Sequence, residues 1–167
     1  MGCRKISKTE YFLRLLFPVR CICCDMVLPI NVLQELCGDC EKSLTLLKEF
    51  EHESAPDSYI SKIYSVFDYE GGIRKAVHRL KFSESPHNAA VLVDVSYPLL
   101  KNLLNEHSSC MPYTKYDIII PVPLHPKRKR QRGYNQSELL ASRLAFYMKI
   151  PMLKGVLVKT VNAPPQS

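Results

Sequence analysis

The sequence predicts an α/β protein made of two parts, a small N-terminal ribbon held by cysteines and a larger domain with a parallel sheet. Three observations support this fold class: two Cys-x-x-Cys pairs near the N-terminus, a β-branched run at Ile118–Ile120, and helical apolar spacing on both sides of that run. A β-branched run without alternation is typical of a strand buried on both faces. We expect the ribbon in residues 1–57 and the sheet domain in residues 58–167.

Composition and apolar run lengths are typical of a soluble globular chain. The 167 residues are 46% hydrophobic and 23% charged, which excludes a disordered or fibrous protein. The longest apolar stretches, such as Val27–Val32 and Ile118–Leu124, are far shorter than the roughly 18 residues that a membrane span needs. We therefore expect no membrane insertion.

The N-terminal segment resembles a targeting signal only superficially. Arg14 interrupts its apolar part, and no small-x-small cleavage site follows. Ile6 stands where a myristoylation motif needs Ser or Thr. Phe12, Leu15 and Leu16 instead fit one face of a short helix. We expect a packing helix in a cytoplasmic protein.

Four of the seven cysteines form two pairs that predict a structural zinc site. Cys21-x-x-Cys24 and Cys37-x-x-Cys40 are separated by twelve residues. Two thiolates three positions apart can bind one ion from a tight turn, and two such turns complete a four-sulfur tetrahedron around zinc. We expect these four cysteines to bind Zn²⁺, which would supply most of the folding free energy of so small a ribbon.

Other roles for the cysteines stay open at the level of sequence. The alternatives are buried free thiols and a redox dithiol, although a redox pair normally occurs singly within a βαβ unit. Cys23 lies between the first pair and could replace one ligand, whereas Cys3 and Cys110 are expected to be free thiols. Four sulfur ligands leave no open coordination position, so the zinc site would not be catalytic.

The remaining chain is predicted to alternate helices with strands. Residues 44–58 are expected to hold a short helix and a polar connection, and residues 60–66 a half-buried strand. A helix over 73–81 follows, with a cationic face that is either merely solvated or turned toward an anion. A second helical pattern covers 88–107, where Pro98 predicts a kink or break.

A basic segment after the β-branched run predicts an anion site. Five cations occur within six positions, in a chain of net charge +7. Asn135 and Glu138 have capping-box spacing, so a helix is expected to begin there. A buried strand, a basic loop and a helix N-terminus form a generic phosphate site, unless the loop is only solvated. The five cations are Lys127, Arg128, Lys129, Arg130 and Arg132.

Together these segments resemble the ComF family of bacterial competence proteins. The resemblance lies in the paired cysteines, in Tyr69–Arg74 and His78–Phe82, and above all in Asp117–Pro126 with Arg132–Ser137. It extends from about Cys21 to the last residue. The resemblance implies an N-terminal zinc ribbon and a type I phosphoribosyltransferase domain, also described as amidophosphoribosyltransferase-like, with a role in DNA uptake.

The resemblance also implies a pyrophosphate site. In the family fold, the Arg132–Asn135 position corresponds to the loop that binds the pyrophosphate of phosphoribosyl pyrophosphate. Full-length relatives would use Mg²⁺ and displace pyrophosphate at the anomeric carbon of this substrate. On this basis we expect six residues to form the anion site. They are Arg128, Arg130, Arg132, Gly133, Tyr134 and Asn135.

The sequence departs from the family pattern at the loop for the ribose 5-phosphate. Type I phosphoribosyltransferases carry two acidic residues followed by Thr-Thr-Gly, which bind the ribose hydroxyls, magnesium and phosphate. No such run occurs in the 167 residues, and Val91–Val95 imitates only its approach strand. We expect a C-terminally truncated, incomplete domain that is catalytically impaired. Mg²⁺ and phosphoribosyl pyrophosphate would bind only a completed site, so enzymatic activity stays open.

Two further functional classes remain beside the phosphoribosyltransferase-like one. The chain could be a non-enzymatic module whose ribbon and basic segment bind single-stranded DNA or a protein of the competence machinery. Tyr59, Tyr64 and Tyr134 would then be candidate stacking surfaces, although such tyrosines are more often ordinary packing residues. The last class is a remnant whose similarity reflects ancestry only.

Overall fold

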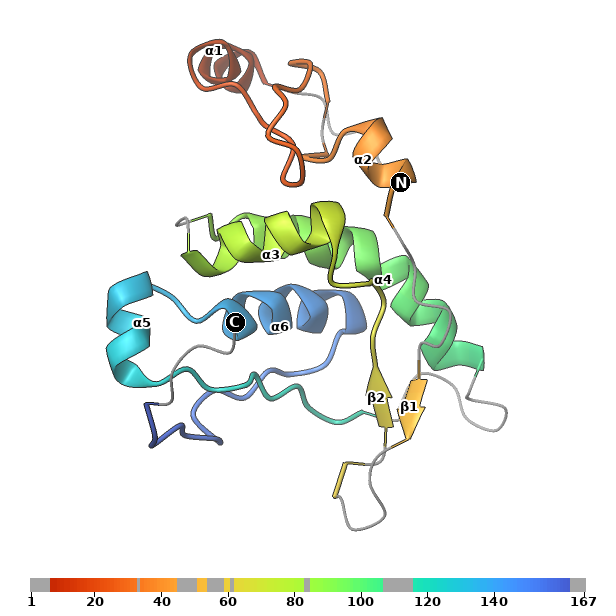
Figure 1. Ribbon diagram of the computed structural model, residues 1–167, viewed down its shortest axis with the longest axis vertical. Coiled ribbons are helices and arrows are strands. Elements are labelled where there is room, and N and C mark those ends of the chain that lie inside the picture. The colour runs from red at the N-terminus through yellow and green to blue at the C-terminus, as the bar shows by residue number, and fades with distance from the viewer. Residues whose placement is uncertain are drawn as a thin grey trace.

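Six helices and two short strands make up the regular structure of the described residues (Figure 1). In chain order they are α1 (Lys8–Leu16), α2 (Gly38–Lys42), β1 (Glu51–Glu53), β2 (Lys62–Tyr64), α3 (Gly71–Phe82), α4 (Asn88–Glu106), α5 (Pro126–Arg132) and α6 (Gln136–Met148). The computed structural model describes residues 7–32, 34–44, 51–53, 59–60, 62–82, 85–106 and 116–162. The described chain is therefore mixed helical with few strands.

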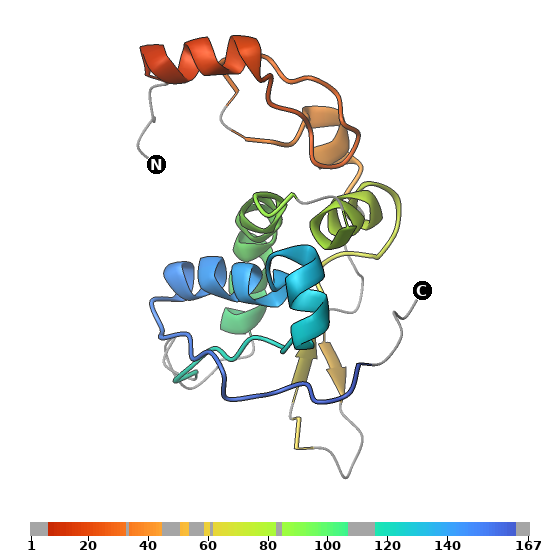
Figure 2. The ribbon, with the colours of Figure 1, turned by 90° about the vertical axis from the view of Figure 1, so that its left-hand side faces the viewer.

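Helix α1 lies apart from α3–α6 in both ribbon views (Figures 1 and 2). Its predicted packing face is exposed, because Phe12, Leu15 and Leu16 keep 60%, 56% and 59% of their surface. The expectation of a packing helix is therefore wrong for the described structure. The helix is held through its polar side instead, since the Arg14 guanidinium donates hydrogen bonds to two backbone carbonyls in the segment 30–32.

Strands β1 and β2 form an antiparallel pair. Glu51 lies opposite Tyr64, and Glu53 lies opposite Lys62. The half-buried strand predicted over 60–66 is confirmed only in Lys62–Tyr64, which form β2. Residues 44–58 are expected to hold a short helix and a polar connection, but residues 51–53 form β1. Their backbone groups pair with those of β2 and not with neighbours within a helix. The expected boundary near residue 57 lies outside the described residues.

The cysteine ribbon and the helices α3 and α4 share one hydrophobic core. Ala76 of α3 is fully buried in this cluster, and Val91 and Val95 of α4 pack against it. A Cβ atom built on Gly72 would lie only 2.9 Å from the Cβ of Cys23, so only glycine allows this close approach. The buried members are Cys21, Ile22, Cys23, Leu28, Leu36, Cys37 and Ala76.

A polar and aromatic cluster joins α4 to α6. The Arg143 guanidinium donates to both carboxylate oxygens of Asp94, at 2.6 and 2.7 Å, and the Tyr147 hydroxyl donates to the same carboxylate at 2.9 Å. The rings of Tyr97 and Tyr147 stack with centroids 4.6 Å apart. Helix α4 continues through Pro98, so the break that this proline could cause does not occur.

The run 116–122 differs most from its predicted structure. Ile119 forms a parallel bridge with Met152, flanked by backbone hydrogen bonds of 2.9 and 3.0 Å. Ile118 and Ile120 remain 41% and 36% exposed, so the expectation of a strand buried on both faces is wrong here. Such burial needs a neighbour at each edge and a packed layer on each face. Among the described residues, only the segment around Met152 pairs with this run.

The basic segment is a helix, α5, and not the predicted loop. His125 Nδ1 accepts a hydrogen bond from Lys127 N at 3.2 Å, and Pro126 occupies the first turn, where its missing N–H costs nothing. Gly133 adopts a left-handed φ of 81° and ends the helix. A proline at the start and a glycine at the end therefore frame a short helix that the charge pattern alone does not reveal.

Helix α6 begins at the predicted position. Asn135 is 4% exposed, and its Oδ1 accepts a hydrogen bond from Ser137 N at 3.0 Å. Its Nδ2 donates to the Val122 carbonyl at 3.1 Å, which ties the run 116–122 to the start of α6. The capping role predicted for Asn135 is confirmed, and the same amide also joins two segments.

Replacing Asn135 with Ala should lower the free energy of unfolding by about 1–3 kcal/mol. The change removes an N-cap, worth about 1 kcal/mol, and leaves the Val122 carbonyl without its amide donor. Urea denaturation measures the effect. Asn135→Ser keeps a cap acceptor and should fall between wild type and Asn135→Ala, whereas the exposed Asn102→Ala should be neutral. An Asn135→Ala protein as stable as wild type would contradict this role.

Candidate metal centre and cationic pocket

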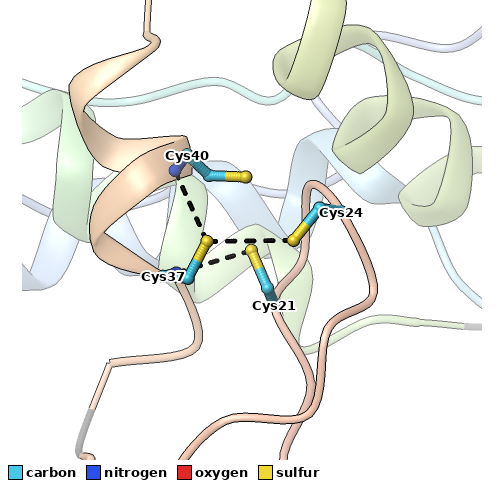
Figure 3. A group of neighbouring side chains, drawn as sticks. All are labelled: Cys21, Cys24, Cys37 and Cys40. Carbon is cyan, nitrogen blue, oxygen red and sulfur yellow. Dashed lines mark hydrogen bonds between the residues drawn. The ribbon is translucent and has the colours of Figure 1, made fainter.

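Four cysteine side chains of the ribbon converge on one point (Figure 3). All four sulfur atoms lie within 4.8 Å of one another, and the sulfurs of Cys24 and Cys37 are 3.8 Å apart. Tetrahedral zinc with Zn–S bonds of about 2.3 Å requires sulfur–sulfur distances of about 3.8 Å. The cluster of Cys21, Cys24, Cys37 and Cys40 could therefore hold a metal ion, as the sequence predicts.

Local backbone structure positions the two cysteine pairs. Cys21 and Cys24 lie on a turn that closes at Asp25, which has a positive φ of 69°. Cys37 is the N-cap of α2, and Cys40 lies in the first turn of that helix. The N–H of Cys37 donates to the sulfur of Cys21, and the N–H of Cys40 donates to the sulfur of Cys37, each at 3.4 Å. These bonds aim the sulfurs at a common centre.

The two buried cysteines of the first turn differ in their electrostatics. Burial raises the pKa of Cys21, but hydrogen bonds from neighbouring backbone groups outweigh it and bring this pKa down to about 6. Burial raises the pKa of Cys23 to about 11. Cys23 lies outside the four-sulfur cluster and packs on α3, where its sulfur is 3.1 Å from a Cβ built at Gly72. It is a packing residue and not a fifth sulfur of the cluster.

A cationic pocket of about 410 Å³ lies between the C-terminal end of α3 and α5. Four of its lining side chains carry a positive charge, and none of the lining residues that the structure describes carries a negative charge. Arg128 Nε donates to the side-chain carbonyl of Asn162 at 3.3 Å, which adds the C-terminal segment to the wall. The side chains from the two helices are Lys81, Phe82, Lys127, Arg128, Gln131 and Arg132.

Contacts between α3 and the end of α5 hold the pocket wall. The Arg132 guanidinium lies 5.4 Å from the centre of the Phe82 ring and donates a hydrogen bond to the Gln136 side chain. Burial lowers the pKa of Arg132, which still remains charged at neutral pH. The Tyr134 hydroxyl donates to the Leu80 carbonyl at 2.7 Å. Tyr134 therefore serves as a packing residue that joins the two walls.

The structure separates the six residues expected at the anion site into two groups. Arg128 and Arg132 line the pocket. The other four lie outside its lining. Gly133 ends α5, and Asn135 is the N-cap of α6. The Tyr134 hydroxyl binds the Leu80 carbonyl, and Arg130 is exposed on α5.

Sequence reasoning did not assign Lys81 and Phe82 to the anion site. Both belong to the segment His78–Phe82 that supports the family resemblance, and Lys81 is one of the cations for which an anion-facing position was an open alternative. The cationic face of α3 divides in the structure. Lys81 lines the pocket, Arg79 contacts the ribbon, and Arg74 is exposed.

The chain is similar in sequence to proteins of two different names. It is 26% identical to competence protein F of Haemophilus influenzae, over 84% of this chain and 66% of that protein. It is 36% identical to the DNA utilization protein YhgH of Salmonella typhi, over 52% of this chain and 37% of that protein. The resemblance to the ComF family is confirmed. The chain thus spans about two thirds or less of the length of these ComF relatives.

Other comparisons add no neighbour. No family model matches the chain, and no solved structure matches it at a significant level. Within the residues that the structure describes, every helix is too short or too polar to cross a membrane.

Proposed function

We propose that the chain acts in DNA uptake or utilization and does so by binding a pyrophosphate-like anion in the cationic pocket. The names of its ComF relatives, competence protein F and DNA utilization protein YhgH, support the first part. The second part rests on one observation. Four cations from two helices, Lys81, Lys127, Arg128 and Arg132, surround one pocket, and no carboxylate lines it among the described residues.

The chemistry of the lining favours pyrophosphate over a single carboxylate. Arg128 and Arg132 offer planar forks of N–H donors that match the oxygens of a phosphate group, and the two lysines add mobile point charges. Because Arg132 is partly buried, its attraction for an anion is screened less than on an open surface. Gly133, Tyr134 and Asn135 would hold the frame on which these arginines stand.

Zinc is the proposed metal of the ribbon. Four cysteine sulfurs this close together favour zinc or iron–sulfur iron among common metals, and a closed four-sulfur zinc site serves structure rather than catalysis. We also propose that residues 1–57 form the ribbon part and that residues 58–167 form part of a phosphoribosyltransferase-like α/β domain. The parallel bridge between Ile119 and Met152 supports this domain assignment. A cytoplasmic location remains part of the proposal.

We propose that these 167 residues bind pyrophosphate without catalysing phosphoribosyl transfer. They contain no acidic pair followed by Thr-Thr-Gly, so they lack groups for the ribose hydroxyls and magnesium in the pattern that the family uses. Mg²⁺ and phosphoribosyl pyrophosphate would bind productively only where such a loop completes the site. These 167 residues therefore bind the anion and carry out no chemical step on it.

Arg132→Ala should weaken pyrophosphate binding by about tenfold or more, because a hydrogen bond to a charged group contributes about 1.5–3 kcal/mol. Arg130→Ala is a matched control: it removes the same charge from α5, two positions away, but from outside the pocket lining. It should change affinity less than threefold. Isothermal titration calorimetry measures both, with thermal melting to check folding. Equal losses in the two variants would show that only the net charge of α5 matters.

A second candidate function is non-specific binding of single-stranded DNA. The observation in its favour is the outer surface of α5, where Lys127, Lys129 and Arg130 are exposed. Lys129 is paired with Glu138 at 3.0 Å, which reduces the charge that this surface presents. Stacking is less well supported, since Tyr134 is engaged with Leu80, although Tyr59 is fully exposed.

A further inference from the structure

Helix α3 contacts the metal-centre turn along its N-terminal half. The side chain of Cys23 packs directly on the backbone of Gly72, and Ala76 is buried in the same core as Cys21. This contact is too close for any side chain at position 72, so the position of the turn 21–24 and the position of α3 are fixed together. Figure 1 shows α3 lying between the ribbon and the helices α5 and α6.

Arg79 strengthens the same contact from the next turn of the helix. Its guanidinium donates to the Ile22 carbonyl at 3.1 Å and to the Cys21 carbonyl at 3.3 Å. It also lies 3.5 Å from the carboxylate of Asp25. One side chain of α3 therefore holds the backbone of the turn that carries two of the four cysteines. All three contacts are made by the same terminal nitrogen of the guanidinium, Nη1.

The C-terminal end of α3 forms one wall of the cationic pocket. Leu80 is buried, and its carbonyl accepts the Tyr134 hydroxyl bond that joins α3 to the chain after α5. Lys81 and Phe82 follow directly and line the pocket. Only one residue, Leu80, separates Arg79 from the pocket wall, so a shift of the helix at Arg79 is carried to Lys81.

We propose that the metal centre and the cationic pocket are energetically coupled through α3, and that Arg79 is the positioning residue that couples them. The inference rests on the proposed pyrophosphate binding. When a metal ion bonds the four cysteines, the turn 21–24 is fixed, and Arg79 and Gly72 hold α3 against it. Lys81 and Phe82 then stand where α5 completes the pocket. Weakening the contact at Arg79 would leave both the turn 21–24 of the metal centre and the α3 wall of the pocket less firmly positioned.

Coupling of this kind has measurable and reciprocal consequences. Loss of a residue that orients metal ligands typically costs about 10–100-fold in metal affinity. Coupling between two sites is typically about 5–150-fold, and it must be the same in both directions. We expect the lower end of each range, because Arg79 acts on backbone carbonyls of the turn and not on the sulfurs themselves.

The test compares zinc-loaded wild type with Arg79→Lys, Arg79→Gln and Arg74→Gln. Arg79→Lys keeps the positive charge but carries it on a shorter side chain that lacks Nη1, the nitrogen that contacts the turn. Arg74→Gln removes the same charge as Arg79→Gln from an exposed position on the same helix. Calorimetry measures pyrophosphate affinity, and metal analysis before and after each titration verifies that zinc stays bound. Competition with a chromophoric chelator, without pyrophosphate, measures zinc affinity. Amide hydrogen exchange reports on residues 80–82.

Both Arg79 variants should bind zinc about tenfold more weakly, bind pyrophosphate about fivefold more weakly, and exchange faster at residues 80–82. Arg74→Gln should stay within twofold of wild type in each measurement. Wild-type pyrophosphate affinity in zinc-loaded Arg79→Lys would overturn the coupling. The affinity would then fall only in Arg79→Gln, and the loss would be due to the missing charge and not to the position of α3. A wild-type protein that binds zinc but no pyrophosphate would instead contradict the proposed function, and the coupling with it.

Discussion

Cys37→Ser should release the metal and unfold the ribbon. Cys37 contributes one of the four clustered sulfurs, caps α2 and accepts the hydrogen bond of Cys40 N. Binding of structural zinc supplies folding free energy directly, since the unfolded chain has no preformed site. Wild type should carry about one zinc per chain, as four-sulfur ligation requires, and the variant close to none after dialysis. Metal analysis with thermal melting measures the change.

The effect of Cys37→Ser should extend beyond the ribbon, because Cys37 and Ala76 belong to one buried cluster. We expect a loss of at least about 3 kcal/mol, which lowers the melting temperature by roughly 6–12 °C for a chain of this size. Cys23→Ser controls for burial, since it alters a buried cysteine outside the cluster and should retain zinc. Cys3 and Cys110, which are expected to be free thiols, lie outside the described residues. A metal-free wild type with unchanged folding would refute the site.

Single-stranded DNA binding, if the outer surface of α5 provides it, should lose much of its salt dependence when Lys127, Lys129 and Arg130 are replaced together by Ala. Each phosphate contact on a single strand contributes roughly 0.7 to the slope of log affinity against log salt. Loss of three contacts should therefore lower the slope by about two units. Affinity for oligonucleotides of different sequence should fall uniformly, because phosphate contacts carry no sequence information.

A triple variant with the same charge loss elsewhere separates local contact from net charge. Arg74, Lys75 and Lys159 are exposed and lie outside α5, so their joint replacement by Ala should leave the slope nearly unchanged. Fluorescence anisotropy at several salt concentrations measures all three proteins. A wild-type slope in the α5 variant would exclude this helix as the DNA contact surface, while pyrophosphate binding in the pocket would remain a separate question.

The metal cluster could be predicted from the sequence because its requirements are local. Each Cys-x-x-Cys pair fits within one turn, and the structure brings Cys21, Cys24, Cys37 and Cys40 together as the spacing indicates. The start of α6 was predictable for the same reason, since Asn135 bonds a backbone group two residues away.

The remaining differences arise where the outcome depends on distant partners. The run 116–122 has the composition of a buried strand, but burial depends on neighbouring strands that the run itself does not encode. The pocket joins Lys81 to Arg128 across 47 positions of the sequence, and no spacing rule connects them. Helix α5 is a different case, because Pro126 and Gly133 are local signals that the five cations obscured.

The contact between Gly72 and Cys23 also limits how the two positions can vary. The clash that a side chain at position 72 would create is with the Cβ atom of residue 23, and every amino acid except glycine has this atom. Glycine is therefore the only residue at position 23 that would remove the clash, because the next atom of that residue, its Cα, lies 4.0 Å away. With any other residue at position 23, relief requires the ribbon backbone to move away from α3, so a substitution at this helical position displaces the cysteine turn.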